Sequence, residues 1–143
     1  MKKLIILIAL TMSALSFADT SVPASSDELS ILSRINNITR TYSATSELEA
    51  KVVEVLYGDG YNASRMILVL DNGYEGAKVF ELGIMMVSVR RITFVAKDKI
   101  VINYVQDDFK GEEMNPYQVN RSVTIQVVRT AEGSIANEIK ILE

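Results

Sequence analysis

The chain has 143 residues, 23% of them charged, a net charge of −3, and neither His nor Cys. Without imidazole or thiolate, it cannot form a Ser-His-Asp or Cys-His catalytic arrangement, nor a zinc site ligated by His or Cys. The length corresponds to one domain, and the mildly acidic charge with scattered basic residues argues against nucleic-acid binding.

The first 18 residues have the organisation of a signal peptide. Lys2 and Lys3 form a charged start, Leu4–Leu15 an apolar run and Ser16–Ala18 a small-x-small cleavage site. The apolar run is shorter than the ~20 residues that span a bilayer, so we expect residues 1–18 to be removed and to leave no stable membrane anchor. A Cys-free exported domain of this size can stand without disulfides, which indicates a bacterial periplasmic or secreted protein.

After a flexible leader over residues 19–24, residues 25–143 are expected to form one globular domain. Ser25 and Glu28 have the spacing of a capping box. Apolar residues then recur at helical spacing: Leu29, Ile31, Leu32, Ile35 and Ile38. The pattern predicts one N-terminal amphipathic helix over residues 27–39 that packs on a sheet, with a partner-binding helix as the alternative.

The rest of the chain predicts a mainly β fold. Ser46–Tyr57 fits a helix as well as a strand, and the Gly58–Gly60 turn that follows favours the strand. About seven antiparallel strands are expected, each rich in β-branched residues: 51–57, 64–71, 77–82, 84–96, 100–106, 121–130 and 135–142. Their spacing is typical of a sandwich or a small barrel. Phe109–Asn120 is expected to be the longest loop.

Two strands on either side of Lys97–Lys99 are expected to form the central hairpin, because two β-branched runs there flank a short polar step. Its apolar face must be covered by the rest of the chain. We expect one buried sheet face to contain Phe94, Ile102, Val123 and Ile125.

Few residues offer chemistry. Acidic residues gather at Asp107, Asp108, Glu112 and Glu113, which could hold Ca²⁺ or act as an acid/base pair. The spacing of an EF-hand is missing, so a solvated loop is the favoured interpretation, and we expect no metal site and no cofactor. Alternation would send Arg90 and Arg91 to opposite faces of their strand and turn one of them inward, which makes Arg90 a candidate anion contact. A β-bulge or a charged edge strand is the favoured interpretation.

An up-and-down order of strands would alternate the connections between two ends of the fold. Tight turns at 72–76, 97–99 and 131–134 share one end. The other end gathers 58–62 and 108–120, where function concentrates on a rigid β scaffold. Its candidate partner-binding residues are Asp59, Tyr61, Asp108, Glu112, Glu113 and Tyr117.

Aromatic rings with polar tips suit a protein or saccharide partner. No motif is specific enough to indicate a family. The sequence therefore predicts an exported, non-catalytic binding module. A small β-barrel carrier of an apolar ligand and a carboxylate-dependent hydrolase are the two alternatives.

Overall fold

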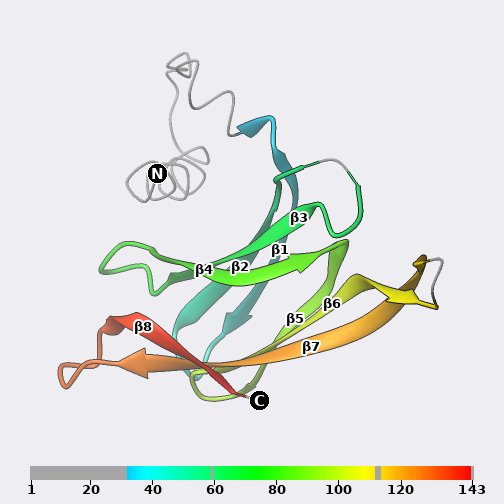
Figure 1. Cartoon of the computed structure of the whole chain (residues 1–143). Helices are drawn as coiled ribbons and strands as arrows, with labels where there is room; N and C mark the ends of the chain where they lie inside the picture. Colours follow the sequence, from blue (N-terminus) through cyan, green and yellow to red (C-terminus); the bar gives the residue numbers. More distant parts are fainter. Residues whose placement is uncertain (1–31, 59, 112–113, 143) are drawn as a thin grey trace.

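The computed structural model describes residues 32–58, 60–111 and 114–142 (Figure 1). These residues form antiparallel strands in two four-stranded sheets, which confirms the mainly β class. The eight strands are β1 (Ile35–Ser43), β2 (Leu48–Leu56), β3 (Ser64–Asp71), β4 (Lys78–Met86), β5 (Ser88–Ala96), β6 (Lys99–Lys110), β7 (Asn115–Arg129) and β8 (Ile135–Leu142). The expected signal peptide and leader lie outside the described residues.

Each sheet is a simple meander, with strand orders β1-β2-β3-β4 and β5-β6-β7-β8. The chain passes from one sheet to the other at Val87. Met86 still pairs with Ser64 in the first sheet, whereas the Val87 N–H donates to the Val105 carbonyl in the second, at 2.8 Å. The expected strand 84–96 is therefore two strands. Gly83, at φ 70°, lies where extra β4 residues bulge out of the ladder with β3, a conformation that favours glycine.

The predicted helix over residues 27–39 is wrong where the structure describes it. Residues 35–39 begin strand β1, which pairs with β2 from Ile35 opposite Val55 to Ser43 opposite Leu48. Residues 27–31 lie outside the described ranges. The segment is rich in β-branched Ile and Thr, and backbone pairing with β2 prevails over the helical spacing of its apolar residues. No helix in the described part of the chain is long and apolar enough to cross a bilayer.

The ambiguous segment Ser46–Tyr57 is strand β2. Its burial alternates strictly, as expected for a strand with one buried face. Four fully buried residues face the interior: Leu48, Ala50, Val52 and Glu54. The extended interpretation of this segment is therefore confirmed.

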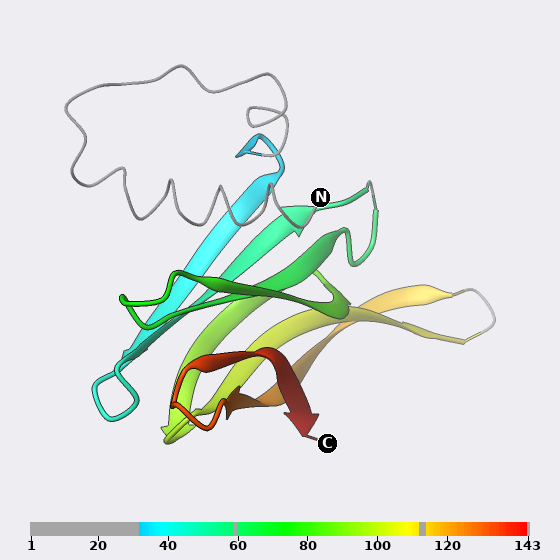
Figure 2. The same ribbon diagram turned by 90° about the vertical axis from the view of Figure 1, so that its left-hand side faces the viewer.

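The two sheets stack as layers with the core between them, as in a β-sandwich (Figure 2). The largest fully buried side chains include Met66, Leu68, Leu70, Met86, Ile100, Ile102 and Ile125. Val123 is also buried, as predicted, but Phe94 is only partly buried. The pairing of β5 with β6 is irregular on both sides of Phe94, between Val89 and Arg91 and between Phe94 and Ala96. These irregularities change which side chains of β5 face the core and leave this end of the strand incompletely covered.

Candidate functional site

The β6–β7 hairpin extends beyond its neighbours at one end of the sandwich (Figures 1 and 2). β5 pairs with β6 as far as Val105, and β8 covers β7 only from Thr124. Within the described residues, the only strand that Gln106–Lys110 pairs with is therefore Asn115–Val119, and the only strand that Asn120–Val123 pairs with is Ile102–Val105 of β6. We call Gln106–Lys110 and Asn115–Val123 the arm.

The predicted long loop Phe109–Asn120 is wrong, because most of it belongs to the arm. The ladder continues without a register shift to Lys110 opposite Asn115, and the Met114 N–H donates to the Gly111 carbonyl at 3.2 Å. Gly111 and Met114 have positive φ, 78° and 52°, respectively, which allows the tight reversal. Polar residues in an exposed hairpin lack the buried face that identifies a strand in a sequence.

The loop between β2 and β3 holds the inner side of the arm. It is closed by the Tyr57 N–H, which donates to the Ala63 carbonyl at 2.8 Å. The Asn62 side chain donates to the Asp107 carbonyl at 2.8 Å and accepts from the Asp107 N–H at 2.7 Å. At this edge of β6, the Asn62 side chain thus provides the hydrogen bonds to the Asp107 N–H and C=O that a neighbouring strand would otherwise provide.

Three aromatic residues lie on the segments that meet at this junction, and we call them the aromatic cluster: Tyr57, Tyr61 and Phe109. The Tyr61 ring stands edge-on against Phe109, with centroids 5.3 Å apart. The Arg65 guanidinium lies 3.4 Å from the centre of the Tyr57 ring, and Glu81 fixes Arg65 through a 2.8 Å ion pair. The rings are held in place although they are 59%, 60% and 36% exposed, respectively.

The structure brings part of the predicted partner-binding set to this end. Tyr117 is exposed on β7, opposite Asp108 on β6. The Tyr117 hydroxyl donates to Asp108 Oδ2 at 3.4 Å, and Arg121 Nη2 lies 3.3 Å from the same oxygen. Asp59, Glu112 and Glu113 lie outside the described residues.

Asp108 is a described member of the predicted acidic group, and both of its carboxylate oxygens have contacts. Asp108 Oδ1 accepts from the Phe109 N–H at 2.9 Å while Oδ2 faces Arg121, so both oxygens are occupied. Among the residues that the structure describes, no three acidic side chains are placed to hold a metal ion.

The favoured β-bulge is found at Arg90, and the less favoured inward position of its side chain is not. Both Arg90 and Arg91 are exposed, because the register shifts between Val89 and Arg91. A bulge inserts one residue into the strand and breaks the alternation of faces. Arg90 therefore lies on the surface and lines no interior anion site.

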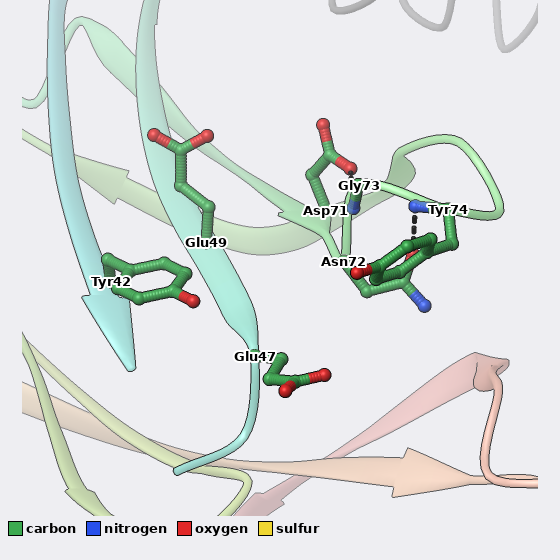
Figure 3. A pocket seen from close by; sticks show the side chains of 7 residues that line it. All are labelled: Tyr42, Glu47, Glu49, Asp71, Asn72, Gly73 and Tyr74. Atoms are coloured by element: carbon green, nitrogen blue, oxygen red, sulfur yellow. Dashed lines mark hydrogen bonds between the residues drawn. The ribbon is translucent and has the colours of Figure 1, made fainter. Parts of the chain in front are cut away.

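An open surface hollow lies at the opposite, tight-turn end (Figure 3). Tyr42 and Tyr74 lie on opposite sides of it, and two of the acids that line it, Glu49 and Asp71, already have partners. Glu49 pairs with Lys51 at 2.9 Å, and Asp71 accepts from the Gly73 N–H at 2.7 Å. The Asp71 contact stabilises the turn that follows β3, and the Glu49 contact lies within β2.

A polar network that the sequence did not indicate joins the turns at this end. Arg129 donates twice to Asp98 Oδ1, from Nε at 3.2 Å and from Nη2 at 2.7 Å. Arg129 also donates to the carbonyls of Ser46 and Gly133, at 3.1 and 3.0 Å. The Asp98 N–H donates to the Ser46 hydroxyl at 3.1 Å. Turns of both sheets are thereby tied together, and Ser46 and Asp98 within this network are buried.

Comparison of the chain with protein-family models, with curated proteins and with solved structures gives no match. The proposal that follows therefore depends on the geometry of the chain itself.

Proposed function

We propose that this chain is an exported, non-catalytic binding module that contacts a protein partner through the aromatic cluster. One observation carries the proposal: Tyr57, Tyr61 and Phe109 are exposed, yet each ring is fixed against a neighbour by a ring contact or a stacked guanidinium. Tyrosine is enriched among the residues that dominate binding energy at protein interfaces. Rings that are already ordered lose less conformational entropy when a partner binds.

The neighbours of the cluster favour a protein over a saccharide as the partner. Leu56 is 40% exposed at the end of β2, next to Tyr57, and Met85 is 36% exposed opposite Arg65. Aliphatic and thioether side chains add an adaptable apolar surface around the rings.

The other functions find less support among the described residues. Fully buried side chains such as Leu68, Ile102 and Ile125 fill the space between the sheets, where a carrier would hold its apolar ligand. The carboxylate of Asp108 is already bound by Arg121 and by a backbone N–H, which does not favour a hydrolase.

The test is a quantitative pull-down with the immobilised chain from Asp19 onward, using envelope extract from the native host. We expect Tyr61→Ala and Phe109→Ala to lose the proteins that the unchanged chain retains. Tyr74→Ala is the matched control, because Tyr74 is 86% exposed at the opposite end. If the Tyr61 and Phe109 variants retain every partner while the Tyr74 variant loses them, the proposal is wrong.

A further inference from the structure

The outer side of the arm is an open strand edge. β8 ends at Leu142, opposite Thr124, and the described residues include no strand beside Pro116–Ser122. This stretch is exposed except for Val119, which is half-buried. Pro116 has no N–H to offer, so the edge that is free to pair is Tyr117–Ser122, six residues or roughly 20 Å of strand. Such an edge is a template for another strand unless its own charges oppose pairing, and the one charged side chain in it, Arg121, already contacts Asp108.

The direction of the backbone groups on this edge follows from the contacts of Asp107. Its N–H and C=O turn away from β7 and bond to the Asn62 side chain. Gln118 faces Asp107 in the ladder. Residues that face each other in an antiparallel pair either bond to each other or both turn outward. The N–H and C=O of Gln118 therefore point to the open edge, and by alternation so do those of Asn120 and Ser122.

We propose that this edge pairs antiparallel with the same edge of a second copy of the chain, about a two-fold axis at Val119. In that register, Gln118 faces Asn120 of the second copy and the two residues exchange backbone hydrogen bonds. Val119 faces its own counterpart. The two copies then form one continuous sheet through β7, with the same residues on each side, as an isologous interface requires.

The side chains select this occupant and this register. With the axis at Val119, Tyr117 of each copy faces Arg121 of the other, so each cationic guanidinium meets an aromatic ring. Asp108 already contacts both Tyr117 and Arg121 within one copy, which supplies a counter-charge on each side. If the axis moves by one residue, to Gln118 or Asn120, Val119 faces Tyr117 or Arg121 of the second copy. The pairing of Val119 with its counterpart and that of Tyr117 with Arg121 are then both lost.

The proposal does not depend on the proposed function. The aromatic cluster gathers on the β6 side of the arm, where Asn62 holds Asp107, whereas the open edge belongs to β7. A dimer would leave the cluster free for a different partner. Failure of one proposal therefore leaves the other standing.

Single cysteines test the pairing, because the chain has none of its own. Val119 would face its counterpart in a non-hydrogen-bonded pair, with Cα atoms about 4.5 Å apart, within the range that a disulfide spans. We expect Val119→Cys to give a disulfide-linked dimer under mild oxidation. Tyr117→Cys and Arg121→Cys should each stay largely monomeric alone and should cross-link when mixed. Val95→Cys, at a position 56% exposed on β5, measures random collision.

Sedimentation of the otherwise unchanged chain gives the second measurement. We expect a dimer, and we expect Gln118→Pro to convert it to a monomer. Proline lacks the N–H that Gln118 would donate to the second copy, and because this N–H points away from β6, the β6–β7 ladder loses no bond. Ile141→Pro is the matched control on the edge of β8 and should leave the dimer intact. Circular dichroism checks that each variant is folded. A monomer at about 100 µM, or cross-linking of Val119→Cys no faster than that of Val95→Cys, would overturn the proposal.

Discussion

The two ends of the sandwich use the same residue types in opposite ways. At the tight-turn end, Asp98 and Arg129 have side chains only 11% and 23% exposed and tie turns of both sheets together. At the arm, Asp108 and Arg121 form an ion pair with side chains 42% and 49% exposed, beside exposed rings. Burial rather than composition thus separates an end that holds the fold together from an end that offers a surface.

The largest effect should come from Arg129→Ala. The substitution leaves the shielded Asp98 carboxylate without its counter-ion and frees the carbonyls of Ser46 and Gly133. Removing one partner of a buried pair costs about 3–5 kcal/mol. Urea unfolding should show this loss of unfolding free energy. Arg129→Lys keeps the charge without the planar fork and should lose less. A loss below about 1 kcal/mol for Arg129→Ala would show that the network does not hold this end.

A smaller effect is expected where Asn62 holds the arm. Asn62→Ala removes two hydrogen bonds to Asp107, at about 1 kcal/mol each, and puts alanine at φ 50°, which asparagine tolerates better. Hydrogen exchange at the Asp107 amide should accelerate before any amide of the tight-turn end. Asn62→Asp keeps the acceptor and loses the donor, so it should retain protection of that amide. Equal acceleration at both ends would mean that the arm does not open independently.

The strands could be predicted wherever one face is buried. The alternation over Arg121–Thr130 predicts Val123, Ile125 and Val127 on the inner face, and all three are buried. Alternation of apolar and polar residues fails to identify a strand where both faces are exposed to water. The sequence of the hairpin over Phe109–Asn120 therefore resembles that of a loop, because its residues are polar. In β1, the spacing of apolar residues suggested a helix, and only pairing with β2 determines the strand.

The contacts at each end depend on residues far apart in the chain. Asn62 bonds to Asp107, 45 residues away, and Arg129 to Asp98, 31 residues away. The up-and-down order of strands predicts that the loops around Tyr61 and Tyr117 lie at the same end. Nothing in the sequence, however, predicts which side-chain amide bonds to which backbone group so many residues away. The role of Phe109 beside Tyr61 was missed for the same reason.

Glu54 offers a further test, with an effect of opposite sign. The carboxylate is fully buried between the sheets, and its Oε1 accepts from Asn37 at 3.0 Å and from the Val89 N–H at 3.1 Å. Its Oε2 has no partner among the described residues. Glu54→Gln keeps the acceptor and removes a carboxylate that is costly to bury. We expect the unfolding free energy to rise by about 1 kcal/mol, because the cost of burying the charge outweighs that of the amide nitrogen that takes the unpartnered place of Oε2. A loss of that size would show that Oε2 needs its charge.

The smallest effect should come from Arg121→Ala, the counterpart of Arg129→Ala at the other end. Both substitutions remove the arginine of an Asp–Arg ion pair. When Arg121 is lost, however, the Asp108 carboxylate stays exposed to water. Exposed pairs contribute about 0.2–1 kcal/mol, and salt screens them. The difference between the unchanged chain and Arg121→Ala should therefore shrink further in 1 M NaCl, whereas the loss in Arg129→Ala should persist. The unfolding free energies should be compared at low protein concentration, where any dimer has dissociated. The difference then reports only the Asp108–Arg121 ion pair within one chain. A loss for Arg121→Ala as large as that for Arg129→Ala would remove the contrast between the two ends.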